Sequence, residues 1–199
     1  EAEELFDQVL DIVSPSDNAY VTALNEQGMV YRSLGQYEKA EKNFFELKSI
    51  DSASVGQDHP YYGITLSNIA LVQTDEGKYA DAEKNLLETL DIQKKNDEMN
   101  STSYARTQTN LARVYQLSGQ PLKAIPLLEQ AAATFKSNLG ENSPEHASAL
   151  FNLGMANWKA GKGAIGIKQL KTSAAIRASA LGKKHPKYAE STQKIAEYQ

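Results

Sequence analysis

The side chains in this sequence most often used as metal ligands or general bases are its three histidines, His59, His146 and His185. Such chemistry would need a second ligand or carboxylate at a fixed short spacing, as in H-E-x-x-H, and the sequence contains no such pair. His59 and His185 each precede a proline, which is typical of a helix start. We therefore interpret the histidines as helix-start or packing residues, and we predict no metal site.

A glycine-rich segment could cradle a phosphate, and the run GKGAIG at residues 161–166 has that composition. A nucleotide-binding loop follows a strand, however, whereas this run follows a predicted helix. The chain has no G-x-S-x-G or G-x-x-x-x-G-K motif and no cysteine, which excludes disulfides, thiolate metal sites and cysteine nucleophiles. The sequence therefore predicts no enzymatic activity and no cofactor.

Amide and aromatic side chains are better candidates for function. Asn68, Asn110 and Asn152 are each 42 residues apart. An Asn amide carries two donors and an acceptor, so it can bracket the backbone of an extended peptide; the alternative is that these amides bridge neighbouring helices. Trp158 is the only tryptophan. It could anchor an interface, or it could pack beneath the last segment of the chain.

The same 42-residue period runs through most of the sequence. It relates the glycines Gly35, Gly77, Gly119 and Gly161, the prolines Pro60, Pro144 and Pro186, and the alanines Ala40, Ala82 and Ala124. A period of this length indicates a repeat protein. Proline suits the first turn of a helix, a left-handed glycine ends one, and apolar residues recur at helical spacing on both sides of each glycine. Each period therefore predicts two antiparallel helices, and the fold class is all-α.

The residues around the first of these glycines resemble a known family. Leu24, Gln27, Gly28 and Tyr31, followed by Ala40 and Phe44, resemble the tetratricopeptide repeat (TPR) pattern. The 42-residue period is similar to the long subclass found in the kinesin light chain and in bacterial TPR arrays. The resemblance implies a right-handed superhelical solenoid of antiparallel helix pairs. Gly163 replaces a tyrosine of the earlier repeats, so we expect the fourth repeat to be the loosest.

The period also predicts the domain organisation, a single TPR solenoid over residues 1–199. Its parts are the second helix of a preceding repeat (1–13), repeat 1 (18–58), repeat 2 (59–100), repeat 3 (101–142), repeat 4 (143–184) and the first helix of a fifth repeat (185–199). A repeat buries its faces against its neighbours. We therefore expect further repeats, or another domain of the same chain, to cover the two ends.

The resemblance implies that the first helices line a concave peptide-binding groove. The candidate groove residues are Asn25, Met29, Arg32, Asn68, Leu71, Arg106, Asn110, Arg113, Phe151, Asn152, Met155 and Trp158. Basic side chains outnumber acidic ones on the wider face that carries these residues, although the whole chain has a net charge of -4. We therefore expect a protein or peptide ligand that is acidic and carries an apolar anchor residue.

The composition argues against several other classes of partner. A net charge of -4 argues against nucleic acid or an anionic membrane as a general partner. No apolar run approaches the length of a membrane span, and we expect a cytoplasmic protein. The sequence thus predicts a non-enzymatic protein-interaction scaffold. The alternatives are a regulatory or substrate-recruiting TPR segment of a larger bacterial signalling protein or protease, and a structural adaptor that oligomerises.

Overall fold

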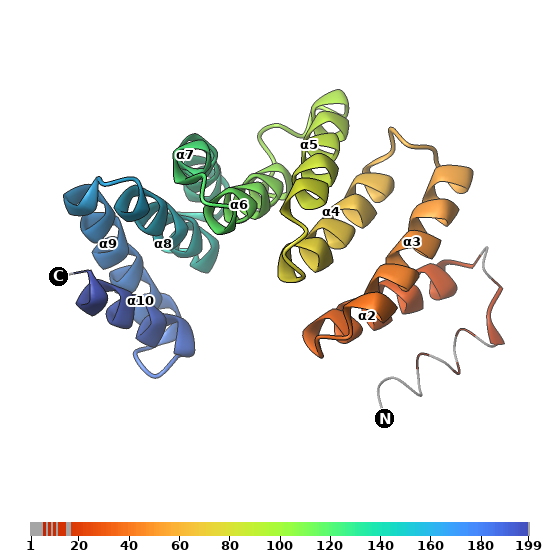
Figure 1. The fold of residues 1–199 in the computed structure, drawn as a ribbon, viewed down its shortest axis with the longest axis horizontal. Helices are drawn as coiled ribbons and strands as arrows, with labels where there is room; N and C mark the ends of the chain where they lie inside the picture. Colours follow the sequence, from red (N-terminus) through yellow and green to blue (C-terminus); the bar gives the residue numbers. More distant parts are fainter. Residues whose placement is uncertain (1–5, 7, 9, 11, 15–16, 199) are drawn as a thin grey trace. The chain divides into compact units, whose positions relative to one another are not determined.

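The computed structural model describes residues 6, 8, 10, 12–14 and 17–198, and this part of the chain consists of helices joined by turns and short loops, without a strand. Its helices, shown in Figure 1, are α2 (Asn18–Ser33), α3 (Tyr37–Ser54), α4 (Pro60–Asp75), α5 (Tyr79–Lys95), α6 (Thr102–Leu117), α7 (Pro121–Leu139), α8 (Pro144–Lys159), α9 (Gly163–Leu181) and α10 (Pro186–Glu197). The helix expected over residues 1–13 lies largely outside the described residues.

The first helix of every repeat begins in the same way. The N-cap residues recur every 42 positions, and in each the side chain accepts a hydrogen bond from a backbone N–H of the first turn; they are Asp17, His59, Ser101, Ser143 and His185. Such a bond satisfies a donor that the helix itself leaves unpaired. His59 and His185 are thus helix caps. His146 is buried, and its Nδ1 lies 2.7 Å from the carbonyl oxygen of Glu141.

The turn within each repeat depends on glycine. Gly35, Gly77, Gly119 and Gly161 have φ between 72° and 82°, a left-handed conformation that favours glycine. After each turn comes the position where the two helices of a repeat approach each other, occupied by Ala40, Ala82 and Ala124, all fully buried. The helix-pair architecture follows from these two positions, which recur at the spacing seen in the sequence.

The helices form two compact units, residues 1–96 and 97–199, each with its own core. In the first unit, Phe44 and Leu47 of α3 pack against Ile69 and Val72 of α4. In the second, Ala105 of α6 and Ala149 of α8 pack around Phe135 of α7. Each core therefore joins helices of successive repeats. The single solenoid over residues 1–199 remains a prediction.

The fourth repeat corrects one expectation. We expected its glycine-rich second helix to pack loosely, but α8 and α9 approach each other closely at Gly154 and Gly166. A Cβ built on Gly166 would lie 2.6 Å from the carbonyl oxygen of Gly154. The glycines therefore permit a close helix contact that the alanine of the other repeats would obstruct.

Alternate repeats share polar contacts that the 42-residue period did not reveal. In repeats 1 and 3, a lysine ammonium lies over a tyrosine ring, Lys39 over Tyr31 and Lys123 over Tyr115. In repeats 2 and 4, the position of that tyrosine holds an amide that bonds to the second helix, Gln73 with Asn85 and Asn157 with Gln169. The contact made at this one position thus alternates from repeat to repeat.

Candidate functional site

In the first unit, the candidate groove residues are largely engaged with one another or with the core. Asn68 Nδ2 donates to Asn25 Oδ1 at 2.8 Å, and Arg32 Nε lies 2.7 Å from Asp75 Oδ2. Both contacts join α2 to α4. The two asparagines therefore follow the helix-bridging alternative, and Arg32 is neutralised by an acidic residue. Met29 packs against the core cluster, and Leu71 is half-buried.

Aromatic candidates in the second unit pack against the last helix. The Trp158 ring stacks on Tyr198, with centroids 4.3 Å apart and 5° between the planes. The Tyr198 hydroxyl also donates to the sulfur of Met155 at 3.3 Å. Trp158 therefore packs beneath the last segment, which was the structural alternative to an interface anchor.

The structure corrects the expectation for Phe151. Its ring is 6% exposed, and the guanidinium of Arg177 lies over it at 4.4 Å from the centroid. Little of this ring is left to contact a ligand. Sequence spacing placed Phe151 on a face of α8 that Arg177 of α9 covers.

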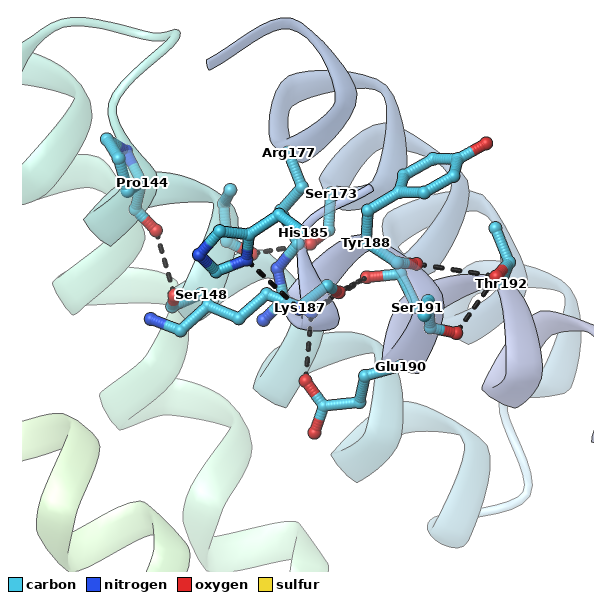
Figure 2. Close-up of polar contacts among 12 residues, drawn as sticks. Pro144, Ser148, Ser173, Arg177, His185, Lys187, Tyr188, Glu190, Ser191 and Thr192 are labelled. Carbon is cyan, nitrogen blue, oxygen red and sulfur yellow. Dashed lines mark hydrogen bonds and ion pairs between the residues drawn. The ribbon is translucent and has the colours of Figure 1, made fainter. Parts of the chain in front are cut away.

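Arg177 of α9 holds α10 against the rest of the second unit through hydrogen bonds (Figure 2). Its Nη1 donates to the Lys187 carbonyl at 2.7 Å and to Ser191 Oγ at 2.8 Å, and it pairs with Glu190 Oε2 at 3.1 Å. Burial lowers the pKa of this guanidinium, and the nearby Glu190 carboxylate opposes that change. A buried arginine with these partners sets where Lys187 lies.

A hollow of about 180 Å³ lies beside this contact, and we call it the second-unit hollow. Its lining residues come from α6, α7, α8 and α10; they are Arg106, Thr109, Asn110, Phe135, Pro144, Glu145, Ser148, Ala149 and Lys187. Figure 2 shows the Lys187 side chain extending toward Ser148. The hollow thus combines apolar atoms of buried Phe135 and Ala149 with polar groups from several helices.

Charge in the second-unit hollow is mostly positive. Arg106 is 65% exposed and contacts Glu145 at 3.5 Å, a long and weak ion pair. Lys187 is exposed, and the described residues offer it no ion pair. The described part of the chain records no side-chain hydrogen bond for Asn110. These groups together can donate hydrogen bonds to a carboxylate.

Sequence reasoning found part of this hollow. It identified Arg106 and Asn110, which the structure brings together, whereas Arg113 and Asn152 lie outside the lining. Lys187 was missed. It lies just after the His-Pro helix start, and nothing in that local pattern indicates that the first turn of α10 lies beside α8.

The described residues contain no group of three or more histidine, aspartate or glutamate side chains placed to hold a metal ion. Among the same residues, no helix combines the length and apolar character needed to cross a membrane.

Comparison with known families decides what the repeats are. The family model described as a tetratricopeptide repeat matches residues 20–95 and 103–163, which is more than half of the chain. The chain belongs to the tetratricopeptide repeat family. The all-α, TPR-like fold class is therefore confirmed, as is the resemblance to the kinesin light chain type.

Solved structures show the same TPR fold. A putative kinesin light chain from Podosopora anserina, with nearly identical TPR-like repeats, is 24% identical with a TM-score of 0.78, over 94% of this chain and 87% of that one. BtubC (BKLC) from P. vanneervenii is 18% identical with a TM-score of 0.80, over 99% of this chain and 78% of that one.

A more distant TPR-like structure is that of a Rap protein complexed with Competence and Sporulation Factor. It is 13% identical with a TM-score of 0.78, over 98% of this chain and 52% of that one. At these identities, the likeness to all three structures establishes the fold alone. No curated protein matches the chain.

TPR repeats make this chain a protein–protein interaction scaffold. The fold is in general non-enzymatic, because its stacked helix pairs present surfaces to a partner rather than a reaction centre.

Proposed function

We propose that the chain binds a segment of a partner protein on the first-helix face of its second unit, with an acidic side chain in the second-unit hollow. One observation carries this proposal: Arg106 and Lys187 come from helices far apart in the sequence and line one hollow together with the amide of Asn110. Cations and an amide donor at one place form a binding site for a carboxylate.

The apolar base of the hollow offers a ligand little area, because Phe135 and Ala149 are only 3% and 0% exposed. Recognition of the ligand therefore rests on its carboxylate, which meets the exposed cations Arg106 and Lys187. The expected ligand is a peptide segment with an accessible aspartate or glutamate.

Peptide selection against the whole chain tests the proposal. Peptides are selected from a random library, and binding of the strongest one is measured by calorimetry for wild type and for Arg106→Ala combined with Lys187→Ala. We expect acidic peptides to be enriched and the double variant to bind about tenfold more weakly, because two cations beside one carboxylate are lost.

Two single variants serve as controls. Arg113→Ala removes an exposed cation from the same helix as Arg106 but outside the hollow, so its effect is expected to be smaller. Lys84→Ala removes an exposed cation on α5 and should leave binding unchanged. Selected peptides without an acidic residue, or equal binding by the double variant and Lys84→Ala, would contradict the proposal.

A further inference from the structure

A second hollow lies in the first unit, between α2, α3 and α4, and we call it the first-unit hollow. Its volume is about 460 Å³, and its lining includes Asn25, Asp51, Tyr61, Ile64 and Thr65. A volume of this size falls within the range of ligand-binding cavities. The nine residues that line it include no lysine, arginine or histidine, so its chemistry differs from that of the second-unit hollow.

Asp51 is a buried carboxylate in this lining. Its side chain lies near the C-terminal end of α3 and is 5% exposed. Its Oδ2 accepts a hydrogen bond from Thr65 Oγ1 at 2.6 Å. A negative charge in the last turn of a helix is unfavourable, because the helix dipole is negative there.

No cation of the described residues compensates this charge. Among the described residues, the structure records no ion pair for Asp51. The lysine one turn earlier, Lys48, places its ammonium 5.7 Å from the Tyr62 ring centroid instead. The sequence has no lysine, arginine or histidine before Arg32, and Arg32 pairs with Asp75. Asp51 therefore has one neutral donor where a buried carboxylate generally has a cation.

The rim of the hollow is apolar and exposed. Tyr61 is 62% exposed and Ile64 is 50% exposed, and both belong to the first turns of α4. An aromatic ring beside an aliphatic side chain can cover the stem of a long basic residue and also attract its charge. The carboxylate below such a rim offers the matching counter-ion.

We propose that the first-unit hollow binds an arginine or lysine side chain of a partner protein, with Asp51 as its counter-ion and with Tyr61 and Ile64 along its aliphatic stem. The inference rests on the proposed function only in that the ligand is again a side chain of a partner. It concerns a different unit and a ligand of opposite charge.

The probes for this inference are N-acetyl-arginine amide and N-acetyl-citrulline amide, which have nearly the same shape but differ in charge. Each is titrated into the whole chain, and backbone amide shifts of Asp51 and Thr65 are followed by NMR. We expect saturable shifts with the arginine probe and about tenfold weaker binding of the citrulline probe, because only the guanidinium forms an ion pair.

Variants separate a binding role from a folding role. Asp51→Asn retains an oxygen that can accept from Thr65, so we expect an equal or higher melting temperature and the loss of the preference for arginine. Ile64→Ala should weaken both probes, since both share the aliphatic stem. Asp81→Asn changes an exposed carboxylate on α5 and should change nothing.

Two results would overturn the inference: equal binding of arginine and citrulline by the wild-type chain, or undiminished arginine binding by Asp51→Asn. Either result would leave the second-unit proposal standing, because that proposal is tested with acidic peptides and with Arg106 and Lys187. The two proposals can therefore fail separately.

Discussion

The two hollows occupy equivalent positions in the repeat and have opposite charge. Their shared lining positions are two repeats apart; they are Thr22, Asn25, Asp51, Tyr61, Ile64 and Thr65 in the first unit and Arg106, Thr109, Phe135, Glu145, Ser148 and Ala149 in the second. The buried Asp51 thus corresponds to the buried Phe135, and Thr22 corresponds to Arg106. One backbone framework thus supports two different surface chemistries at the same repeat positions.

The polar contacts between the first helices of successive repeats also differ between the two units. Arg32 and Asp75 form an ion pair in the first unit. At the equivalent positions of the second unit, Lys159 Nζ reaches only the backbone carbonyl of Gln116, at 3.5 Å. The polar face of the first unit is therefore satisfied within the unit, whereas that of the second has more groups available to a ligand.

The largest expected effect comes from a variant that disturbs the second unit and should leave the first unit unchanged. Arg177→Ala removes three hydrogen bonds to α10 and the cover of Phe151. We expect a loss of about 2–4 kcal/mol in the free energy of unfolding, because a buried charged donor is removed from its partners. Acidic-peptide binding should fall with it, since α10 carries Lys187. Urea denaturation and calorimetry measure the two effects.

The first-unit hollow is the internal control for that variant. Binding of N-acetyl-arginine amide should be the same in Arg177→Ala as in wild type, because Arg177 contacts only the second unit among the described residues. If arginine binding fell together with acidic-peptide binding, the two hollows would not be independent sites.

A smaller effect concerns the close helix contact of the fourth repeat. Gly166→Ala introduces the residue that Ala40, Ala82 and Ala124 supply in the other repeats. Its Cβ would meet the Gly154 carbonyl and the Trp158 backbone nitrogen, at 2.6 and 2.9 Å. We expect destabilisation of about 1–3 kcal/mol by overpacking, measured as a lower urea midpoint. Lys168→Ala, on the exposed face of α9, is the control and should have little effect. An unchanged midpoint for Gly166→Ala would show that the helices can separate there freely.

The asparagines that recur every 42 residues give a third comparison of the two units. Asn68→Ala removes the 2.8 Å bond to Asn25, so we expect a loss of about 1 kcal/mol in stability. Asn152→Ala should have almost no effect. In the second unit the position of Asn25 is held by Thr109, whose hydroxyl instead donates to the Ala105 carbonyl. Equal effects in thermal denaturation would mean that the amide bridge contributes nothing to the first unit.

The smallest expected effect is a difference in salt dependence. Raising the NaCl concentration should weaken acidic-peptide binding, because Arg106 and Lys187 are exposed to solvent and are screened by ions. Arginine binding at the buried Asp51 should change less over the same range, since buried pairs are screened less. Calorimetric titrations of both ligands at low and high salt test this. Equal slopes would indicate that both ligands bind at an exposed surface.

Much of the helical framework could be predicted because its signals are local. A cap such as Ser101 acts on an N–H within its own first turn, and a turn such as Gly77 depends on its own φ angle. Burial of Ala82 between paired helices also follows from the repeat register. The candidate site was predicted only in part: Arg106 and Asn110 were found, while Lys187 and the hollow itself were not.

The sequence by itself thus determined the repeat family, the order of the helices and the faces that carry polar side chains, since these depend on short-range spacing and a constant period. Only the tertiary structure decided which of those side chains are already engaged in contacts within the chain. Asn25 and Asn68 pair across 43 residues, and Arg177 reaches over Phe151 to α10. Such contacts depend on the separation of packed helices and on burial, which a periodic pattern does not specify. The period does align Asp51 with Phe135, but only the tertiary structure showed that this carboxylate is buried and lines a hollow.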